Sequence, residues 1–506
     1  MKASLFVGPL LGYEGDGQYT VCFLSGKNIE QAKISIDGRT VKATILKDIP
    51  DGRFWRAEVR IEPGEKGRFI QYDVHLNSQV ASDTHNRKSW EFYVPANNEE
   101  PKFAYASCNG VSKADLITKI DDPFALWRHM SERHRERPFS LLLMGGDQVY
   151  ADSIWEKVKT LTDWSSLKLE DQKRRKPTKI MSRQIDQFYS KLYRERWSDE
   201  YMSYMLASVP SLMMWDDHDI FDGWGSFPKE LQETPVFSEI FKYAKKYFEL
   251  FQIRSLSNHS LLSKDGAHYA FCLSFNGYTI LGLDNRSDRT IRQVMSAKQW
   301  EQVLATLENT TEGTLLIMSA VPVVYRDFSF TETAFDVTPW DENLTDDLKD
   351  HWRAKEHQGE RSRLIMRLLE NAKLRHKTDQ PIKTVILSGD VHVGCLGVIT
   401  DFRDDNPIKI HQIVSSGIVH PAPSLLQWLG ISAVTNDNIE VINEERTIEA
   451  SMLKPVGSKR YIRERNFVTL EEGTDDKLWV NWITEDCMSE TSERPEYPIT
   501  PRQAGK

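Results

Sequence analysis

The sequence predicts a layered α/β fold preceded by an all-β unit, and two observations lead to this expectation. From about residue 102 to 430, short apolar runs that suit strands alternate with helical patterns, as in layered α/β domains. Before them, residues 1–98 hold six short runs rich in β-branched and aromatic residues, separated by turn signals such as Asp37-Gly38. We therefore expect a small β-sandwich of immunoglobulin or fibronectin character at residues 1–98 and an α/β domain at residues 99–435.

The remaining elements can be placed approximately. A one-sided apolar pattern predicts a connecting helix at residues 122–137, and similar patterns mark residues 185–196, 237–251, 297–307 and 360–374. The strongly charged residues 168–179 suit a solvated loop or helix face. We expect a C-terminal extension at residues 436–506, with a β-hairpin formed by residues 466–471 and 477–484 and a frayed tail from residue 489.

Composition excludes several classes of function. The 506-residue chain has a formal net charge of -9, which argues against specific nucleic-acid binding or an anionic-membrane partner. No apolar stretch reaches the length of a membrane span. The five cysteines are scattered without a close pair, so neither a disulfide framework nor a zinc ribbon is indicated. The sequence does not define an oligomeric state.

The N-terminus superficially imitates a secretory signal, because Lys2 precedes an apolar run. The run is short, contains Gly8 and Pro9, and lacks a typical cleavage site, so a first strand and turn is the better interpretation. We expect a cytoplasmic location, with an extracytoplasmic one as the alternative.

Three apolar runs far apart in the sequence each end in residues that can bind metals, at residues 140–152, 210–222 and 384–392. Two further runs lead into Cys108 and into Asp284 and Arg286. Open α/β sheets gather their ligands at the C-terminal ends of strands. The sequence therefore predicts a metal-centred active site where these strand ends meet.

The segment Gly146-Asp147-Gln148-Val149-Tyr150 is the strongest single signal. A carboxylate just past a strand can bridge two metal ions, and Tyr150 can return toward the same ion as a phenolate. Because a phenol has a pKa of about 10, phenolate binding favours a strongly Lewis-acidic ion such as a ferric one. The alternative is a turn aspartate with Tyr150 packed in the core.

The second run ends in four carboxylates and a histidine, at Asp216, Asp217, His218, Asp219 and Asp222. So many acids repel one another unless a cation neutralises them or water solvates them. Solvation is hard to arrange directly after the apolar SLMMW segment, so we expect a cation site rather than a solvated acidic turn.

The third run places Asp390 and His392 two residues apart, so both side chains can point to one side of an extended segment. A lone histidine is usually a hydrogen-bonded core residue, but the strand-end pattern occurs here for the third time. Cys108 is by default a small buried hydrophobe, yet its place after a strand allows a thiolate ligand, which would favour a ferric ion over magnesium. Arg286 suits phosphate through bidentate hydrogen bonds, or a salt bridge to the nearby acids.

These motifs together resemble the PhoD-type alkaline phosphatases and phosphodiesterases of the calcineurin-like metallophosphoesterase superfamily. The resemblance covers VGP at Val7-Gly8-Pro9, then ASC, GDQVYAD, WDDHD, the D-x-R-x-x-R segment and SGDVH, in this order. It implies an N-terminal β-sandwich and a catalytic domain of layered α/β/β/α type.

The resemblance also implies ligand sets. A ferric ion, Fe3+, would be held by Cys108, Asp147, Tyr150 and His392. Asp147 would bridge to a second, harder ion, usually Ca2+, with Asp390 and oxygen ligands from the WDDHD turn, for which we take Asp217 and Asp222. Mn2+, Mg2+ and Zn2+ are alternatives at this second site, because Asp222 stands where family members often carry a neutral asparagine and adds negative charge.

From this reading we expect metal-dependent hydrolysis of a phosphate ester, monoester or diester, by a metal-activated hydroxide. His218 is the candidate for contacting the phosphate or protonating the leaving oxygen, and Arg286 for clamping the anion. One alternative is a catalytically weak metal-binding interaction protein. Another is a phospholipase-like phosphodiesterase acting on lipid head groups, in which residues 221–227 and 423–429 would line a lipid-tolerant cleft, although core packing explains these apolar stretches more simply.

Overall fold

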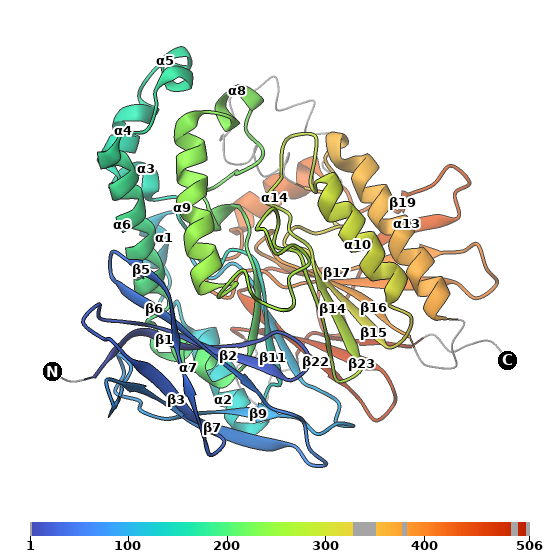
Figure 1. Cartoon of the computed structure of the whole chain (residues 1–506). Helices are drawn as coiled ribbons and strands as arrows, with labels where there is room; N and C mark the ends of the chain where they lie inside the picture. Colours follow the sequence, from blue (N-terminus) through green and yellow to red (C-terminus); the bar gives the residue numbers. More distant parts are fainter. Residues whose placement is uncertain (1–2, 327–350, 377–381, 487–493, 502–506) are drawn as a thin grey trace.

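The computed structural model describes residues 3–326, 351–376, 382–486 and 494–501. In these parts of the chain, two large β-sheets and one small sheet form the framework, and helices cover them (Figure 1). Strands from the N-terminus, the middle and the C-terminus of the chain meet in the same sheet, so the sheets do not follow the order of the sequence.

The first large sheet has the strand order β24-β23-β22-β10-β11-β12-β1-β2-β6-β5. Its strands are β1 (Leu5–Tyr13), β2 (Gln18–Ser25), β5 (Thr44–Ile49), β6 (Gly52–Arg60), β10 (Phe103–Ala106), β11 (Leu141–Gly145), β12 (Ser211–Met214), β22 (Asn466–Glu472), β23 (Leu478–Thr484) and β24 (Glu496–Ile499). At its centre β10, β11 and β12 run parallel, with Leu142 opposite Ser211. All three central strands are fully buried, which explains why they appear in the sequence as continuous apolar runs.

The small sheet has the order β4-β3-β7-β8, with β9 paired to β7. Its strands are β3 (Ala32–Ile36), β4 (Arg39–Lys42), β7 (Arg68–Leu76), β8 (Gln79–Val80) and β9 (Trp90–Val94). The rings of Tyr19 in β2 and Phe92 in β9 lie 5.0 Å apart, so this sheet packs against the N-terminal strands of the first sheet. The N-terminal unit is therefore sandwich-like, but β1 pairs with β12 through Gly12 and Ser211, and one of its two sheets continues into the α/β domain. A boundary at residue 98 stays a prediction.

The second large sheet has the order β13-β14-β15-β16-β18-β17-β20-β19, with β21 paired to β17. Its strands are β13 (Phe271–Phe275), β14 (Tyr278–Gly282), β15 (Thr314–Met318), β16 (Thr384–Ser388), β17 (Gly394–Asp401), β18 (Ile408–Val414), β19 (Glu440–Val441), β20 (Ile448–Leu453) and β21 (Tyr461–Ile462). Strands β14, β15, β16 and β18 run parallel.

Alternating residues of β15 serve two different cores. Leu316 and Met318 belong to the core shared with the first sheet, whereas Leu315 and Ile317 belong to the core under α10 and α13. This period of two places the second sheet between another sheet and a helical layer. Helix α7 contacts β1, and α2 packs on α7. The layered α/β/β/α architecture expected from the sequence is confirmed.

The helices are α1 (Ala114–Ile117), α2 (Ala125–Glu136), α3 (Ile154–Lys157), α4 (Lys159–Ser165), α5 (Leu169–Arg174), α6 (Lys179–Arg196), α7 (Glu200–Ser208), α8 (Lys229–Gln232), α9 (Pro235–Phe251), α10 (Ala297–Asn309), α13 (Gln358–Arg375) and α14 (Leu425–Val434), with the 3-10 turns η1 (Asp217–Asp219) and η2 (Lys355–His357). Each of the five helices expected from the sequence is present. Four of them agree with the expected bounds within three residues, whereas α6 begins at Lys179, six residues earlier than expected. The charged segment around residue 170 forms the exposed helix α5.

The C-terminal residues complete the first sheet. The expected hairpin forms as β22 and β23, and β22 pairs with β10 beside the strands that lead into the site. Within the expected frayed tail, Glu496–Ile499 form β24 and pair with β23, so this part of the prediction was wrong; the edge of the hairpin supplies the partner. Residues 489–493 and 502–506 of that tail lie outside the described residues. Among the described residues, no helix is long and apolar enough to span the hydrocarbon core of a bilayer.

Candidate metal centre

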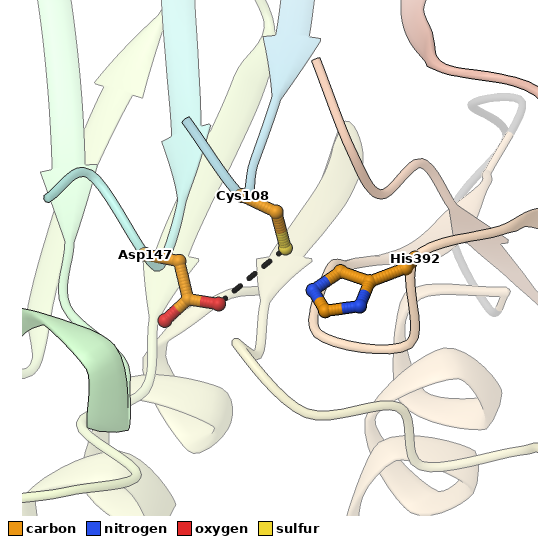
Figure 2. Close-up of side chains that lie close together, drawn as sticks. All are labelled: Cys108, Asp147 and His392. Atoms are coloured by element: carbon orange, nitrogen blue, oxygen red, sulfur yellow. Dashed lines mark hydrogen bonds between the residues drawn. The ribbon is translucent and has the colours of Figure 1, made fainter. Parts of the chain in front are cut away.

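The loops that follow β10, β11 and β12 of the first sheet meet the loop that follows β16 of the second. Figure 2 shows Cys108, Asp147 and His392 converging from three separate segments of the chain. Hydrogen bonds join these loops: the backbone N–H of Asn109 donates to Asp147 O and that of Ala151 donates to His218 O, both at 2.8 Å. The Ser107 hydroxyl donates at 2.9 Å to Ser415 O, in the loop after β18, which pairs with β16. The strand ends that the sequence singled out are thus adjacent in space.

One group of potential ligands consists of Cys108, Asp147 and His392, which we call the Cys108 cluster. Their ligand atoms all lie within 4.8 Å of one another. The Cys108 sulfur lies 3.5 Å from Oδ2 of Asp147 (Figure 2). The Tyr150 hydroxyl lies 3.3 Å from that same oxygen and 3.4 Å from Nε2 of His392. Sulfur, phenol oxygen, carboxylate and imidazole therefore surround one point, as the family resemblance implied.

The backbone at this cluster is held in an unusual conformation. Cys108, Asp147, Asp390 and His392 all have positive φ angles, of 53°, 55°, 69° and 53°. For a non-glycine residue such a conformation raises the free energy of the folded state by roughly 1–3 kcal/mol, so it persists only where surrounding contacts impose it. Residues of this kind gather at sites where side chains must point in a set direction, which agrees with a ligand role for these four.

Two further groups extend the site. Asp147, Asp217 and His218 form one, and Asp216, Asp217 and Asp390 form the other, which we call the carboxylate cluster; in each, the ligand atoms lie within 4.8 Å of one another. Asp147 joins the first two groups and Asp217 joins the last two. The three groups therefore form one continuous chain of potential ligands rather than separate sites.

Arg286, which follows β14, lies beside the carboxylate cluster and is fully buried. Its Nε donates to Oδ1 of Asp216, its Nη2 lies 3.5 Å from Oδ1 of Asp217, and its Nη1 donates to Trp224 O at 3.0 Å. Of the two alternatives considered for this arginine, the salt bridge to the nearby acids is the one seen in the structure. Its role as a clamp for an anion stays a prediction.

His218 is paired with a carboxylate that the sequence reading did not single out. Its Nδ1 lies 2.9 and 3.0 Å from the two oxygens of Asp152, and its ring stacks on Tyr150 with the centroids 4.2 Å apart. Burial opposes a charge on His218, but the carboxylates of Asp152, Asp217 and Asp147 outweigh burial and raise its pKa well above the usual value. His218 is thus held in one orientation by Asp152 and Tyr150, and its role as a proton donor stays a prediction.

Asp219 supports the site without belonging to any of the three groups. It accepts hydrogen bonds from the backbone N–H groups of Gln148, Val149 and Asp216 and from the Gln252 side chain. Burial raises its pKa to about 7, although these hydrogen bonds act in the opposite direction. Asp219 therefore ties the turn after β12 to the turn after β11.

The donors fit a bound cation. Burial raises the pKa of Asp147 well above its usual value. The charge of His218 acts in the opposite direction, but repulsion from Asp216, Asp217 and Asp219 adds to the effect of burial. Burial likewise raises the pKa of the Cys108 thiol, and the charge of Asp147 adds to this effect. Oδ1 of Asp147 is buried and has no hydrogen-bond partner among the described residues. A multivalent cation would satisfy this oxygen and favour the charged form of each ligand.

Most of the ligands expected from the sequence are brought together, but Asp222 is not. It lies outside the three groups of the described residues, and its backbone N–H donates to Oδ1 of Asp152 at 2.8 Å. After the turn η1 the chain returns to Asp217, since the backbone N–H of Gly223 donates to Oδ2 of Asp217 at 2.7 Å. A ligand role for Asp222 stays a prediction. The carboxylate cluster instead contains Asp216, which was not among the ligands expected from the sequence.

His420 is another residue of the site that the sequence reading missed. It is buried, and its ring lies 3.6 Å from that of His392. The signal was present, because His420 follows the strand-like run 408–414 as the other site residues follow theirs. The polar residues between strand and histidine, Ser415 and Ser416, made the pattern less obvious.

Two apolar stretches near the site differ in their burial. Phe221 and Trp224 are buried in a cluster of aromatic rings, so core packing accounts for them. In α14, by contrast, Leu425, Leu426 and Leu429 are 61%, 81% and 55% exposed. Core packing therefore explains the first stretch but not the second.

Comparison with known proteins identifies relatives of the chain. The profile of the family described as PhoD related phosphatase matches residues 79–339. A Saccharomyces cerevisiae protein, named as uncharacterized protein YGR266W, is 27% identical over 437 residues, which cover 73% of this chain and 60% of that protein. The chain thus spans less than two thirds of the length of this curated relative.

Two solved structures share the fold. One, described as the structure of PhoD, has a TM-score of 0.62 and 13% identity, with 100% of this chain and 92% of that chain covered. The other, purple acid phosphatase PPD1 from Lupinus luteus seeds, has a TM-score of 0.52 and 13% identity, with 99% and 74% covered. At this identity the likeness concerns the fold alone.

Proposed function

The chain belongs to the PhoD-related phosphatase family, and on this premise we propose that it hydrolyses phosphate esters, as a phosphomonoesterase, a phosphodiesterase or both, at a mixed-metal centre. The family membership confirms the resemblance found in the sequence. The observation that carries the proposal is the continuous chain of buried and partly buried ligands, in which Asp147 links the Cys108 cluster to the next group and Asp217 links that group to the carboxylate cluster. Such shared ligands suit two ions side by side.

The two ends of this ligand chain favour different ions. The Cys108 cluster with Tyr150 offers sulfur, phenolate and imidazole donors, a set that favours Fe3+ over Mg2+. The carboxylate cluster offers oxygen alone and suits a hard cation such as Ca2+, with Mn2+, Mg2+ or Zn2+ as alternatives. When bound, such ions polarise a phosphoryl group and lower the pKa of a coordinated water.

The protein's own groups then orient the substrate and move protons. His218, with its raised pKa, would donate a proton to the phosphate or to the leaving oxygen, and Asp152 would hold the ring in the required orientation. Arg286 is buried against Asp216 and Asp217, which supports a role in positioning these two carboxylates.

The test uses p-nitrophenyl phosphate and bis(p-nitrophenyl) phosphate as a monoester and a diester probe, together with metal analysis of the purified protein. Asp147→Asn should lower turnover by about 100-fold or more and reduce metal content, because it weakens the shared ligand. The control is Asp163→Asn, which changes an exposed carboxylate in α4 and should leave both unchanged. Full turnover in Asp147→Asn, or a wild-type protein without metal, would contradict the proposal.

The same measurement separates the enzyme from a catalytically weak metal-binding interaction protein. That protein would retain metal in the wild type and turn over neither ester.

A second candidate function is hydrolysis of lipid head groups, and the exposed leucines of α14 favour it. Helix α14 follows His420 closely in the chain and contains no charged residue. Its opposite face is anchored, since the Trp428 ring lies 5.0 Å from the ring of Tyr461. A phospholipid offers both an apolar phase for these leucines and a phosphate ester for the site.

Replacing Leu425, Leu426 and Leu429 together by serine tests this candidate. The exposed area of these three side chains is about that of two fully exposed leucines. Transferring that area from water into lipid lowers the free energy by about 3–6 kcal/mol. The variant should therefore lose about 100-fold or more in activity toward phospholipid vesicles and keep its activity toward the soluble probes. Ile45→Ser, which changes a leucine-sized side chain with 48% exposure in β5, is the control. Equal activity on vesicles with and without the leucines would exclude lipid docking through α14.

A further inference from the structure

We propose that His420 is a positioning residue for the metal centre: its ring holds the side chains of His392 and Tyr150 in their orientations without binding the ion itself. The inference rests on the proposed function, because it assumes that the Cys108 cluster binds a metal. It assigns a role to a residue that lies outside the three ligand groups of the described residues.

The first support is a stack of aromatic rings. The ring of His420 lies 3.6 Å from that of His392, at an angle of 13°, and 5.7 Å from that of Tyr150, at 22°. Tyr150 in turn stacks on His218. Two expected ligands thus pack near the same imidazole ring, which restricts their rotation.

The second support is the way in which the loop that carries His420 is anchored. The backbone N–H groups of Val419 and His420 donate to Cys108 O at 3.4 and 3.1 Å, and that of Ile418 donates to Ser107 O at 3.1 Å. The segment preceding His420 is therefore bonded directly to the strand end that carries the Cys108 ligand.

Ser416, in the same loop, reaches two other members of the cluster. Its hydroxyl lies 3.1 Å from the Cys108 sulfur and accepts the backbone N–H of His392 at 2.7 Å. A single loop thus contacts Cys108, His392 and Tyr150, which come from three different parts of the chain. Such supporting contacts set the direction of metal ligands.

The geometry also indicates why His420 is not a ligand of the ion held by His392. A metal ion lies close to the plane of each imidazole that binds it, about 2.1 Å from the nitrogen. The planes of His392 and His420 are nearly parallel and stacked, so their lone pairs run side by side and do not converge on one point.

The stacking of the rings, rather than the hydrogen bonding of the nitrogens, excludes His420 as a ligand of that ion. Because a carbonyl oxygen can only accept, Nδ1 carries the proton and donates to Pro421 O at 2.9 Å. Nε2 is buried and has no hydrogen-bond partner among the described residues. Neither nitrogen bonds to His392 or Tyr150, so the ring acts on them through its face, and a phenylalanine of similar shape can replace it.

The experiment compares His420→Ala with His420→Phe in the full chain. Each protein is freed of metal with a chelator and titrated with Co2+, and the affinity and the visible absorption spectrum are recorded. We expect His420→Ala to bind Co2+ about 10- to 100-fold more weakly, with shifted absorption bands, as is typical when supporting contacts of a metal ligand are lost. His420→Phe should bind within about threefold of the wild type, because it preserves the stack.

His411→Ala is the matched control. His411 is also buried, but it pairs with Val385 near the beginning of β16, away from the site that follows the end of this strand. This variant should lower the melting temperature of the metal-free protein and leave Co2+ binding unchanged, so it separates a general loss of stability from an effect on the metal centre.

Three results would overturn the proposal. Wild-type affinity and spectrum in His420→Ala would show that the ring does not position the ligands. A loss in His420→Phe as large as in His420→Ala would show that a nitrogen of His420 is needed. A wild-type chain that takes up no Co2+ would overturn this inference together with the proposed metal centre, whereas the first two results leave that centre intact.

Discussion

Replacing Arg286 by methionine tests how the carboxylates of the site are balanced in the absence of metal. The guanidinium is 0% exposed and lies between Asp216, Asp217 and the carbonyl of Trp224. Methionine fills much of the same volume but carries no charge and donates no hydrogen bond. The substitution therefore removes a cation next to two buried carboxylates, together with the hydrogen bond to the Trp224 carbonyl.

The expected magnitude follows from the burial of this pair. Removing one partner of a buried ion pair typically costs 3–5 kcal/mol, because the remaining charge stays away from water. We expect the metal-free Arg286→Met variant to lose about this much of its free energy of unfolding. A bound cation supplies charge at the same place, and an ion at 1,000 times its dissociation constant stabilises a protein by about 4 kcal/mol. Metal should therefore stabilise the variant more than it stabilises the wild type.

The assay is urea unfolding followed by tryptophan fluorescence, with chelator and with saturating Mn2+. Arg375→Met is the control, because Arg375 is also fully buried but donates to Gly313 O and to the Asn371 side chain, on a helix outside the site. Its loss should lower stability equally with and without metal. The reasoning fails if metal-free Arg286→Met is as stable as the wild type, or if Mn2+ stabilises it no more than it stabilises Arg375→Met.

Two further predictions concern histidines. Asp152→Asn removes the carboxylate that holds His218, so turnover of either ester should fall by about 10- to 100-fold while metal content stays unchanged; a parallel loss of metal would point to a ligand role instead. Burial lowers the pKa of His134 to about 4, from a usual value of 6.5, and its Nδ1 accepts the N–H of Phe139. The unfolded chain therefore takes up a proton more readily than the folded one between these values, so the stability that His134 contributes near pH 7 is lost as the pH falls toward 4. The loss from pH 7 to pH 5 should be about 2 kcal/mol in urea unfolding, and His134→Gln, which can still accept the Phe139 N–H, should reduce it; an unchanged pH dependence in this variant would contradict the assignment.

Local features of the sequence were enough to predict the type of fold and the core of the site. The central strands appear as apolar runs because they are buried on both faces, and Asp147, Tyr150, Asp390 and His392 stand directly after them. A residue that follows a parallel strand lies at the carboxyl edge of its sheet wherever the sheet is placed. Cys108 and His392 follow strands of two different sheets and stand 284 positions apart, so it was the family resemblance that assigned them to one ion.

Which of the neighbouring polar residues face one another depends on how distant parts of the chain pack. The turn after β12 brings the carboxylates of Asp216 and Asp217 to the cluster, whereas Asp222 contacts Asp152 through its backbone N–H, and this arrangement depends on the backbone conformation rather than on residue type. The contacts of His420 with His392 and of β1 with β12 join segments that are distant in the chain. Such contacts arise from the packing of whole sheets, which no local pattern encodes. The order of residues thus places the reactive side chains at the strand ends, and the packing of the two sheets sets the distances and angles between them.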